Sequence, residues 1–105
     1  MKLITVQELR KFREQDVAFE LIDVREPYET EMCSMGGKPM PMSQLMDHLA
    51  DIPKDRPVVV HCRSGSRSCA VVDTLSTRYG FTNLMHLQGG ILAWQAEVDQ
   101  SLHCD

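Results

Sequence analysis

The sequence has no excess of basic residues, which argues against nucleic acid as a partner. Lysine and arginine together number 11 against 15 aspartate and glutamate residues, so the 105-residue chain carries a net charge of −4. Proteins that bind nucleic acid generally present a basic face, and no such face dominates this sequence. An apolar run of membrane-spanning length is missing too, so we expect no membrane partner.

A secretory signal and a metal-binding cysteine pattern are also missing. The opening residues, MKLITVQELRKF, bring in charges too early for a signal peptide, so we expect a cytoplasmic protein with reduced thiols. No two cysteines form a CxxC pair or have the spacing of a zinc ligand set. The cysteines are Cys33, Cys62, Cys69 and Cys104. We therefore expect no metal site and no other cofactor.

The residues that are present are typical of one globular α/β domain over 1–105. Hydrophobic residues make up 43% and charged residues 25% of the chain, and no repeat or linker divides it. Predicted strands alternate with predicted helices, which favours a mainly parallel sheet with helices on both faces. The predicted strands cover residues 3–4, 18–24, 38–42, 58–60 and 84–87. The predicted helices cover residues 6–15, a segment that starts near 43, a segment that ends before 80 and a segment around 91–98.

Local signals set the ends of several of these elements. Thr5 and Glu8 form a T-x-x-E capping box at the start of the first helix, and Ser43 is predicted to cap the second. Between them, Tyr28–Met42 is predicted to be irregular, because Gly36-Gly37 and two prolines oppose a helix. Three methionines of this segment are predicted to fill the core: Met35, Met40 and Met42.

The stretch Pro57–Gly80 carries the strongest functional signal. Its apolar run Val58–Val60 predicts a buried strand, and apolar residues at helical spacing follow a loop, CRSGSR, that begins at Cys62. Ligand sites of open α/β sheets lie at the carboxyl ends of the strands. The backbone N–H groups of a loop entering a helix would stabilise a thiolate on Cys62, or an anion bound to its sulfur.

The charges of this loop favour a reactive cysteine over one that only fills space in the core. Arg63 and Arg67 would stabilise the thiolate by opposite charge, so we expect the pKa of Cys62 to lie below that of a free thiol. The loop residues expected to bind an anion are Arg63, Ser64, Gly65, Ser66 and Arg67. A structural cysteine, common at the end of a strand, stays an alternative.

Two chemistries suit a cysteine in such a loop. A phosphatase loop holds a tetrahedral phosphate and needs one residue more between its cysteine and its arginine than separate Cys62 from Arg67. An obvious general acid for a leaving alkoxide is also missing. Sulfur transfer needs only a cradle for one sulfur, in which the Cys62 thiolate becomes a persulfide and passes the sulfur on. A phosphatase, an arsenate reductase and a non-catalytic binding module stay alternatives.

Asp23 and Arg25 lie at the carboxyl end of the predicted strand at 18–24. If the strands are parallel, these two residues lie at the same edge of the sheet as Cys62, because parallel strands end on one side. We therefore expect both to border the site.

Three segments of the chain resemble the rhodanese family of sulfurtransferases. They are LIDVREPYE at 21–29, VVVHCRSGSRS at 58–68 and LQGGILAW at 87–94, in an order and spacing that together are highly specific. The resemblance is to single-domain rhodaneses of the thiosulfate type and implies a five-stranded, mainly parallel sheet. It also implies Cys62 as the persulfide-carrying nucleophile, residues 63–67 as the anion-binding loop, and a supporting role for Gly89, Gly90 and Trp94.

The same resemblance implies the partners. They are a small anionic sulfur donor, such as thiosulfate or a persulfide, and an acceptor that is a protein or a small thiol. The chain departs from the usual family motif after the second strand, where it reads MCSMGGKPMP and places Cys33 near the usual histidine. That segment resembles rhodanese domains fused to enzymes that activate ubiquitin-like proteins. Cys33 and Cys69 are candidates for a second, resolving thiol.

Overall fold

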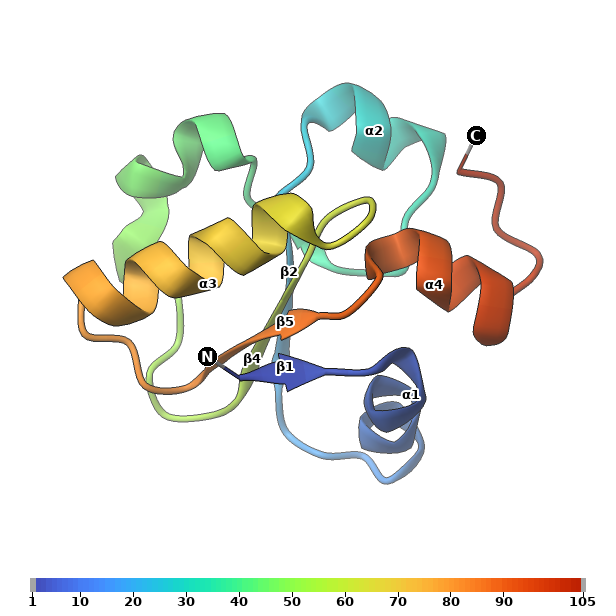
Figure 1. Cartoon of the computed structure of the whole chain (residues 1–105), viewed down its shortest axis with the longest axis horizontal. Coiled ribbons are helices and arrows are strands. Elements are labelled where there is room, and N and C mark those ends of the chain that lie inside the picture. The colour runs from blue at the N-terminus through green and yellow to red at the C-terminus, as the bar shows by residue number, and fades with distance from the viewer. Residues whose placement is uncertain (1, 105) are drawn as a thin grey trace.

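The computed structural model describes residues 2–104, which form a five-stranded parallel sheet flanked by helices (Figure 1). Met1 and Asp105, the two ends of the domain expected over 1–105, lie outside the described residues. The strand order is β1-β5-β4-β2-β3, and every pair of neighbours runs parallel. The strands are β1 (Leu3–Ile4), β2 (Glu20–Asp23), β3 (Lys38–Pro39), β4 (Val58–His61) and β5 (Leu84–Leu87). The α/β fold expected from the sequence is confirmed.

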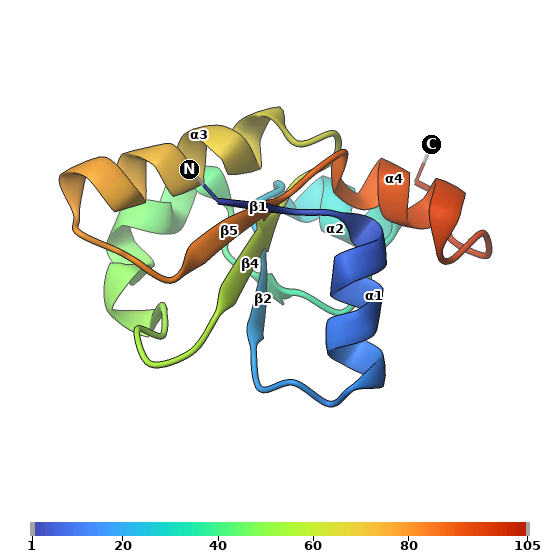
Figure 2. The ribbon, with the colours of Figure 1, turned by 60° about the horizontal axis from the view of Figure 1, so that its bottom comes forward.

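Helices cover both faces of this sheet. They are α1 (Val6–Glu14), α2 (Pro27–Met32), the 3-10 helix η1 (Met42–Asp51), α3 (Ser66–Arg78) and α4 (Gly90–Glu97). Helix α3 and η1 lie on one face, and α1 and α4 lie on the other (Figures 1 and 2). Helix α2 lies at the edge of the sheet where β2 and β4 end (Figure 1). This edge carries the loop that begins at Cys62.

Strand β4 is central because its side chains are apolar on both faces. Val58 and Val60 point into the cluster under α3 and η1, and Val59 points into the cluster under α1 and α4. All three valines are at most 2% exposed, as a strand covered on both faces requires. Cys62 therefore follows the carboxyl end of a strand that is buried on both faces.

Several predicted boundaries are wrong in instructive ways. Tyr28–Met32 is not irregular but belongs to α2, where Pro27 occupies the first turn and Glu26 N donates to Glu29 Oε1 at 3.2 Å. Proline is tolerated at that position because its missing N–H would have no partner inside the helix. The glycines and prolines that argued against a helix act only beyond Met32. Strand β2 is also shorter than the predicted span of 18–24.

The segment after β3 also differs from its prediction, in where its helix begins and in which methionine is buried. Ser43 lies inside η1 rather than at its cap, and its hydroxyl donates to Glu26 Oε1 at 2.7 Å. Of the methionines predicted to fill the core, Met35 and Met40 are buried, but Met42 is 40% exposed. Met42 is the first residue of η1 and belongs to neither core cluster.

The expectation of reduced thiols is wrong for two of the four cysteines. Cys33 and Cys104 form a disulfide, whereas Cys62 and Cys69 remain thiols. The chain after α4 turns back toward α2 (Figure 1), which brings the two Cα atoms to 5.2 Å, within the usual range for a disulfide. Cys33 is therefore committed to Cys104 and does not serve as a second thiol.

The disulfide closes a long loop and should stabilise the fold. Because it joins residues 71 positions apart, reduction should lower the free energy of unfolding by about 2–4 kcal/mol. Guanidinium unfolding with and without reductant measures this difference, and Cys104→Ser provides the control because reductant should not affect that variant. Equal unfolding midpoints for the wild type in the two buffers would contradict the expectation.

Candidate active site

Cys62 follows β4 directly, and its side chain is fully buried. The loop then turns at Gly65, the N-cap of α3, which has the left-handed φ of +109° that glycine tolerates. A Cβ on Gly65 would also lie 3.3 Å from the backbone N of Gly89. The turn thus needs glycine for its backbone angle and for its close contact with the neighbouring loop.

Two backbone N–H groups and one hydroxyl surround the sulfur of Cys62. Gly65 N donates to Sγ at 3.1 Å and Ser68 N donates at 3.4 Å, while Ser68 Oγ lies 3.6 Å from Sγ. Burial raises the pKa of the Cys62 thiol, but these hydrogen bonds outweigh it and hold the pKa below its ordinary value. Backbone amides and one hydroxyl, rather than the arginine charges predicted from the sequence, are the main source of the low pKa.

Ser68 contacts the sulfur but was not among the site residues predicted from the sequence. It lies just beyond the loop of residues 63–67, in the first turn of α3, and is fully buried. The N–H groups of a first helical turn have no partner inside the helix and point toward its N-terminus. That rule could have identified Ser68, because Gly65 as N-cap puts Ser68 at the third helical position.

Arg67 points to a carboxylate rather than to an open anion site. Its two terminal nitrogens contact the two oxygens of Glu29 at 2.6 and 2.8 Å, a bidentate pair between α3 and α2. The side-chain hydrogen bonds from Arg67 lower the pKa of Glu29 to about 2, so Glu29 is ionised at any ordinary pH. Glu29 belongs to the LIDVREPYE segment but was not predicted to be a site residue.

The other polar side chains of the loop are exposed on the surface. Arg63 is exposed, and its guanidinium donates to the backbone O of Cys104 at 2.8 Å. Ser64 and Ser66 are exposed as well, and no contact of theirs with the sulfur is present among the described residues. Of the five residues predicted to bind an anion, Gly65 therefore has the most direct contact with Sγ.

Asp23 and Arg25 form a buried ion pair beside the site. Arg25 Nη2 lies 2.6 Å from Asp23 Oδ2 and also donates to the backbone O of Cys33 at 2.8 Å. Burial raises the pKa of Asp23, but hydrogen bonds from Arg25 outweigh it, and the net shift is downward. The pair joins β2 to the segment that follows α2. Asp23 has no exposed surface, whereas Arg25 reaches the wall of a cavity next to the loop.

That cavity has a volume of about 250 Å³ and lies between α2, the Cys62 loop and the end of the chain. Its lining residues are Arg25, Tyr28, Glu29, Met32, Arg63 and Cys104. The cavity thus brings together two of the three arginines predicted near the site, Arg25 and Arg63. It also contains the carboxylate of Glu29, which pairs with the third, Arg67. Its wall includes Arg63, the residue that follows Cys62 in the loop.

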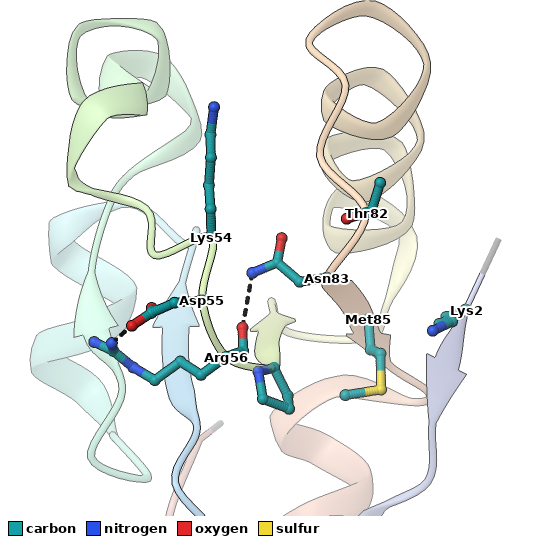
Figure 3. Close-up of a pocket in the computed structure, with 8 residues that line it drawn as sticks. Lys2, Lys54, Asp55, Arg56, Thr82, Asn83 and Met85 are labelled. Carbon is teal, nitrogen blue, oxygen red and sulfur yellow. Dashed lines mark hydrogen bonds and ion pairs between the residues drawn. The ribbon is translucent and has the colours of Figure 1, made fainter.

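A cavity of about 480 Å³ lies at the opposite, amino end of the strands (Figure 3). It contains Lys2 and Lys54, but its Arg56 is paired with Asp55 at 3.0 Å and with Glu20 at 3.3 Å. Asn83 closes one wall by donating to the backbone O of Arg56 at 2.7 Å (Figure 3). The cavity therefore lies at the end of the sheet opposite to Cys62.

The Gly89-Gly90 turn supports the loop from the side. Ile91 N and Leu92 N, in the first turn of α4, donate to the carbonyls of Cys62 and Arg63 at 3.0 and 3.1 Å. A Cβ on Gly90 would lie 2.4 Å from the Arg63 carbonyl oxygen, so only glycine permits this approach. Trp94 is buried on the same helix, with the Arg13 guanidinium 4.9 Å from its ring centroid. These positions agree with the supporting role implied by the family resemblance.

Residues 2–104 contain no group of three or more His, Cys, Asp or Glu side chains placed to hold a metal ion. None of the described helices is long and apolar enough to cross a membrane.

Comparisons with known proteins agree with this architecture. The model of the rhodanese-like domain family matches residues 5–97. A sulfurtransferase of Allochromatium vinosum is 37% identical over 75 residues, which cover 70% of this chain and 69% of that protein. The "Probable adenylyltransferase/sulfurtransferase MoeZ" of Mycobacterium tuberculosis is 33% identical over 102 residues, 94% of this chain but only 26% of the relative's length.

Solved structures show the same fold. A rhodanese-related protein from Thermoplasma volcanium superposes with a TM-score of 0.82 at 30% identity, covering 93% of this chain and 94% of that one. A rhodanese-like domain protein from Staphylococcus aureus superposes with a TM-score of 0.83 at 29% identity, covering 100% and 99% of the two chains. With the cysteine loop at the carboxyl end of a parallel sheet and the family match over residues 5–97, the chain belongs to the family of rhodanese-like domains.

Proposed function

We propose that this protein is a sulfurtransferase that carries a sulfane sulfur as a persulfide on Cys62. The observation that carries the proposal is the pair of amides, Gly65 N and Ser68 N, that point at Sγ from 3.1 and 3.4 Å. Two N–H donors at these distances stabilise a thiolate on Sγ or the charge on one further sulfur atom bound to it. The sulfurtransferases among the relatives support the same class of reaction.

The first half-reaction loads the enzyme. The Cys62 thiolate attacks the outer sulfur of an anionic donor, thiosulfate or a persulfide, and forms a new S–S bond. The S–S bond inside the donor breaks, and the leaving group takes the electron pair. The leaving group is sulfite when the donor is thiosulfate and a thiolate when the donor is a persulfide. The loop amides then stabilise the negative charge on the terminal sulfur of Cys62.

The second half-reaction unloads the enzyme. A thiophilic acceptor, such as cyanide, a small thiol or a thiol of another protein, attacks the terminal sulfur. The S–S bond to Cys62 breaks, and its electron pair stays on Sγ, which regenerates the thiolate. A low pKa favours this step because a stable thiolate is a good leaving group. The two steps predict ping-pong kinetics.

Sulfur loading can be read directly from the mass of the protein. After incubation with thiosulfate, the intact wild type should gain the mass of one sulfur, and Cys62→Ser should gain none. Cys69→Ser is the matched control, because it removes the other thiol and should still load. A wild type that gains no mass and forms no thiocyanate from cyanide would overturn the proposal. Hydrolysis of an aryl phosphate that depends on Cys62 would point to the phosphatase alternative.

The low pKa of Cys62 predicts the pH dependence of its alkylation. Because hydrogen bonds to the sulfur favour the thiolate, the rate of reaction with iodoacetamide should reach half its maximum below the free-thiol value of about 8.5. Ser68→Ala removes the hydroxyl that is hydrogen-bonded to the sulfur and lowers its pKa, so it should raise this midpoint by about 0.5–1 unit. Ser66→Ala, an exposed serine in the same helical turn, should leave the midpoint unchanged. Equal midpoints for Ser68→Ala and Ser66→Ala would contradict the assignment of Ser68.

A further inference from the structure

The cavity beside Cys62 has a negative charge in its wall, which is unexpected for a site that receives an anion. The charge is that of Glu29, in α2, whose side chain is 12% exposed. The Arg67 side chain, from the loop side, is 32% exposed. Arg67, one of the two cations of the Cys62 loop, is thus paired with a carboxylate that lines the cavity.

The geometry fixes Glu29 in this position. Each of its carboxylate oxygens accepts from one terminal nitrogen of Arg67, at 2.6 and 2.8 Å. Oxygen Oε1 also accepts from Glu26 N at 3.2 Å, and the Glu29 carbonyl accepts from Arg25 Nη1 at 3.2 Å. The first turn of α2 therefore orients the carboxylate, which in turn occupies both terminal nitrogens of the Arg67 guanidinium.

We propose that Glu29 determines donor specificity by holding Arg67, so that the site disfavours dianionic donors such as thiosulfate relative to donors of lower charge, such as the hydropersulfide of a neutral thiol. This inference rests on the proposed sulfur transfer through Cys62. It concerns the charge of the donor, which the shape of the sulfur cradle does not select.

The physical reason is the balance of charge at the mouth. A dianion that approaches the pair meets the negative Glu29 as well as the positive Arg67, and the two effects largely cancel. Because the Glu29 pKa is lowered to about 2, the carboxylate stays charged across the whole range in which the enzyme can be assayed. A donor with one charge or none interacts less strongly with both members of the pair, since the Coulomb energy is proportional to the donor's charge.

Glu29→Gln tests the charge alone. Glutamine has the same length and can still accept from Glu26 N, as the third residue of a capping box. Glu31→Gln is the matched control, because Glu31 is exposed on the same helix and its substitution makes the same change in net charge. Each variant is assayed with thiosulfate and with the hydropersulfide of 2-mercaptoethanol, with cyanide as acceptor. In ping-pong kinetics kcat/KM for a donor reports the loading step only.

At low ionic strength, Glu29→Gln should raise kcat/KM for thiosulfate about three- to tenfold, mainly through a lower KM, because Arg67 becomes available. The hydropersulfide should change less than about twofold, and Glu31→Gln should change neither donor by more than that. Added salt should diminish the gain, since the mouth is open to solvent. Glu29→Asp, which retains the charge, should keep the wild-type ratio between the two donors.

Three results would overturn the inference. The first is an unchanged donor ratio in Glu29→Gln relative to Glu31→Gln. The second is a Glu29→Asp variant that matches Glu29→Gln, because contact geometry rather than charge would then set the ratio. The third is a wild type that gains no sulfur on Cys62 from either donor by intact mass. That last result removes the proposed function as well, whereas the first two leave it standing.

Discussion

The structure of the site depends on the orientation of the peptide groups that follow β4. Ile91 N and Leu92 N donate to the carbonyls of Cys62 and Arg63 at 3.0 and 3.1 Å. With these carbonyls directed toward α4, the N–H of Gly65 can turn toward the sulfur at 3.1 Å. The first turn of α4 therefore orients the carbonyls of the loop, and the first turn of α3 supplies the donors. The missing Cβ of Gly90 makes this arrangement possible.

This arrangement separates the reactivity of the cysteine from the net charge of its surroundings. The thiolate is stabilised by amide dipoles and by Ser68, which are fixed in the fold and do not attract ions from a distance. Two of the three arginines near the loop are paired with carboxylates, Arg25 with Asp23 and Arg67 with Glu29, whereas Arg63 donates to a backbone carbonyl. A chain with a net charge of −4 can thus lower the pKa of a buried thiol without a strongly basic surface.

Local patterns in the sequence were enough to predict the strand, loop and helix around Cys62, because each was encoded within a few residues. The apolar run of β4 and the position of Gly65 are examples. Contacts between distant segments could not be predicted in this way. Arg67 and Glu29 are 38 positions apart, and the disulfide partners are 71 apart. Nothing near Arg67 in the chain indicates that α2 will bring a carboxylate to it, and only the folded sheet edge brings these segments together.

The disulfide extends the same argument to the wall of the cavity. Its two cysteines also supply backbone acceptors, since Cys33 O accepts from Arg25 and Cys104 O accepts from Arg63, both at 2.8 Å. The covalent bond therefore fixes the positions of two carbonyls that orient two arginines beside the loop. Tyr28, 68% exposed, lines the same cavity and adds apolar surface to its rim. The wall of this cavity is thus held by a covalent bond on one side and by the Arg67–Glu29 pair on the other.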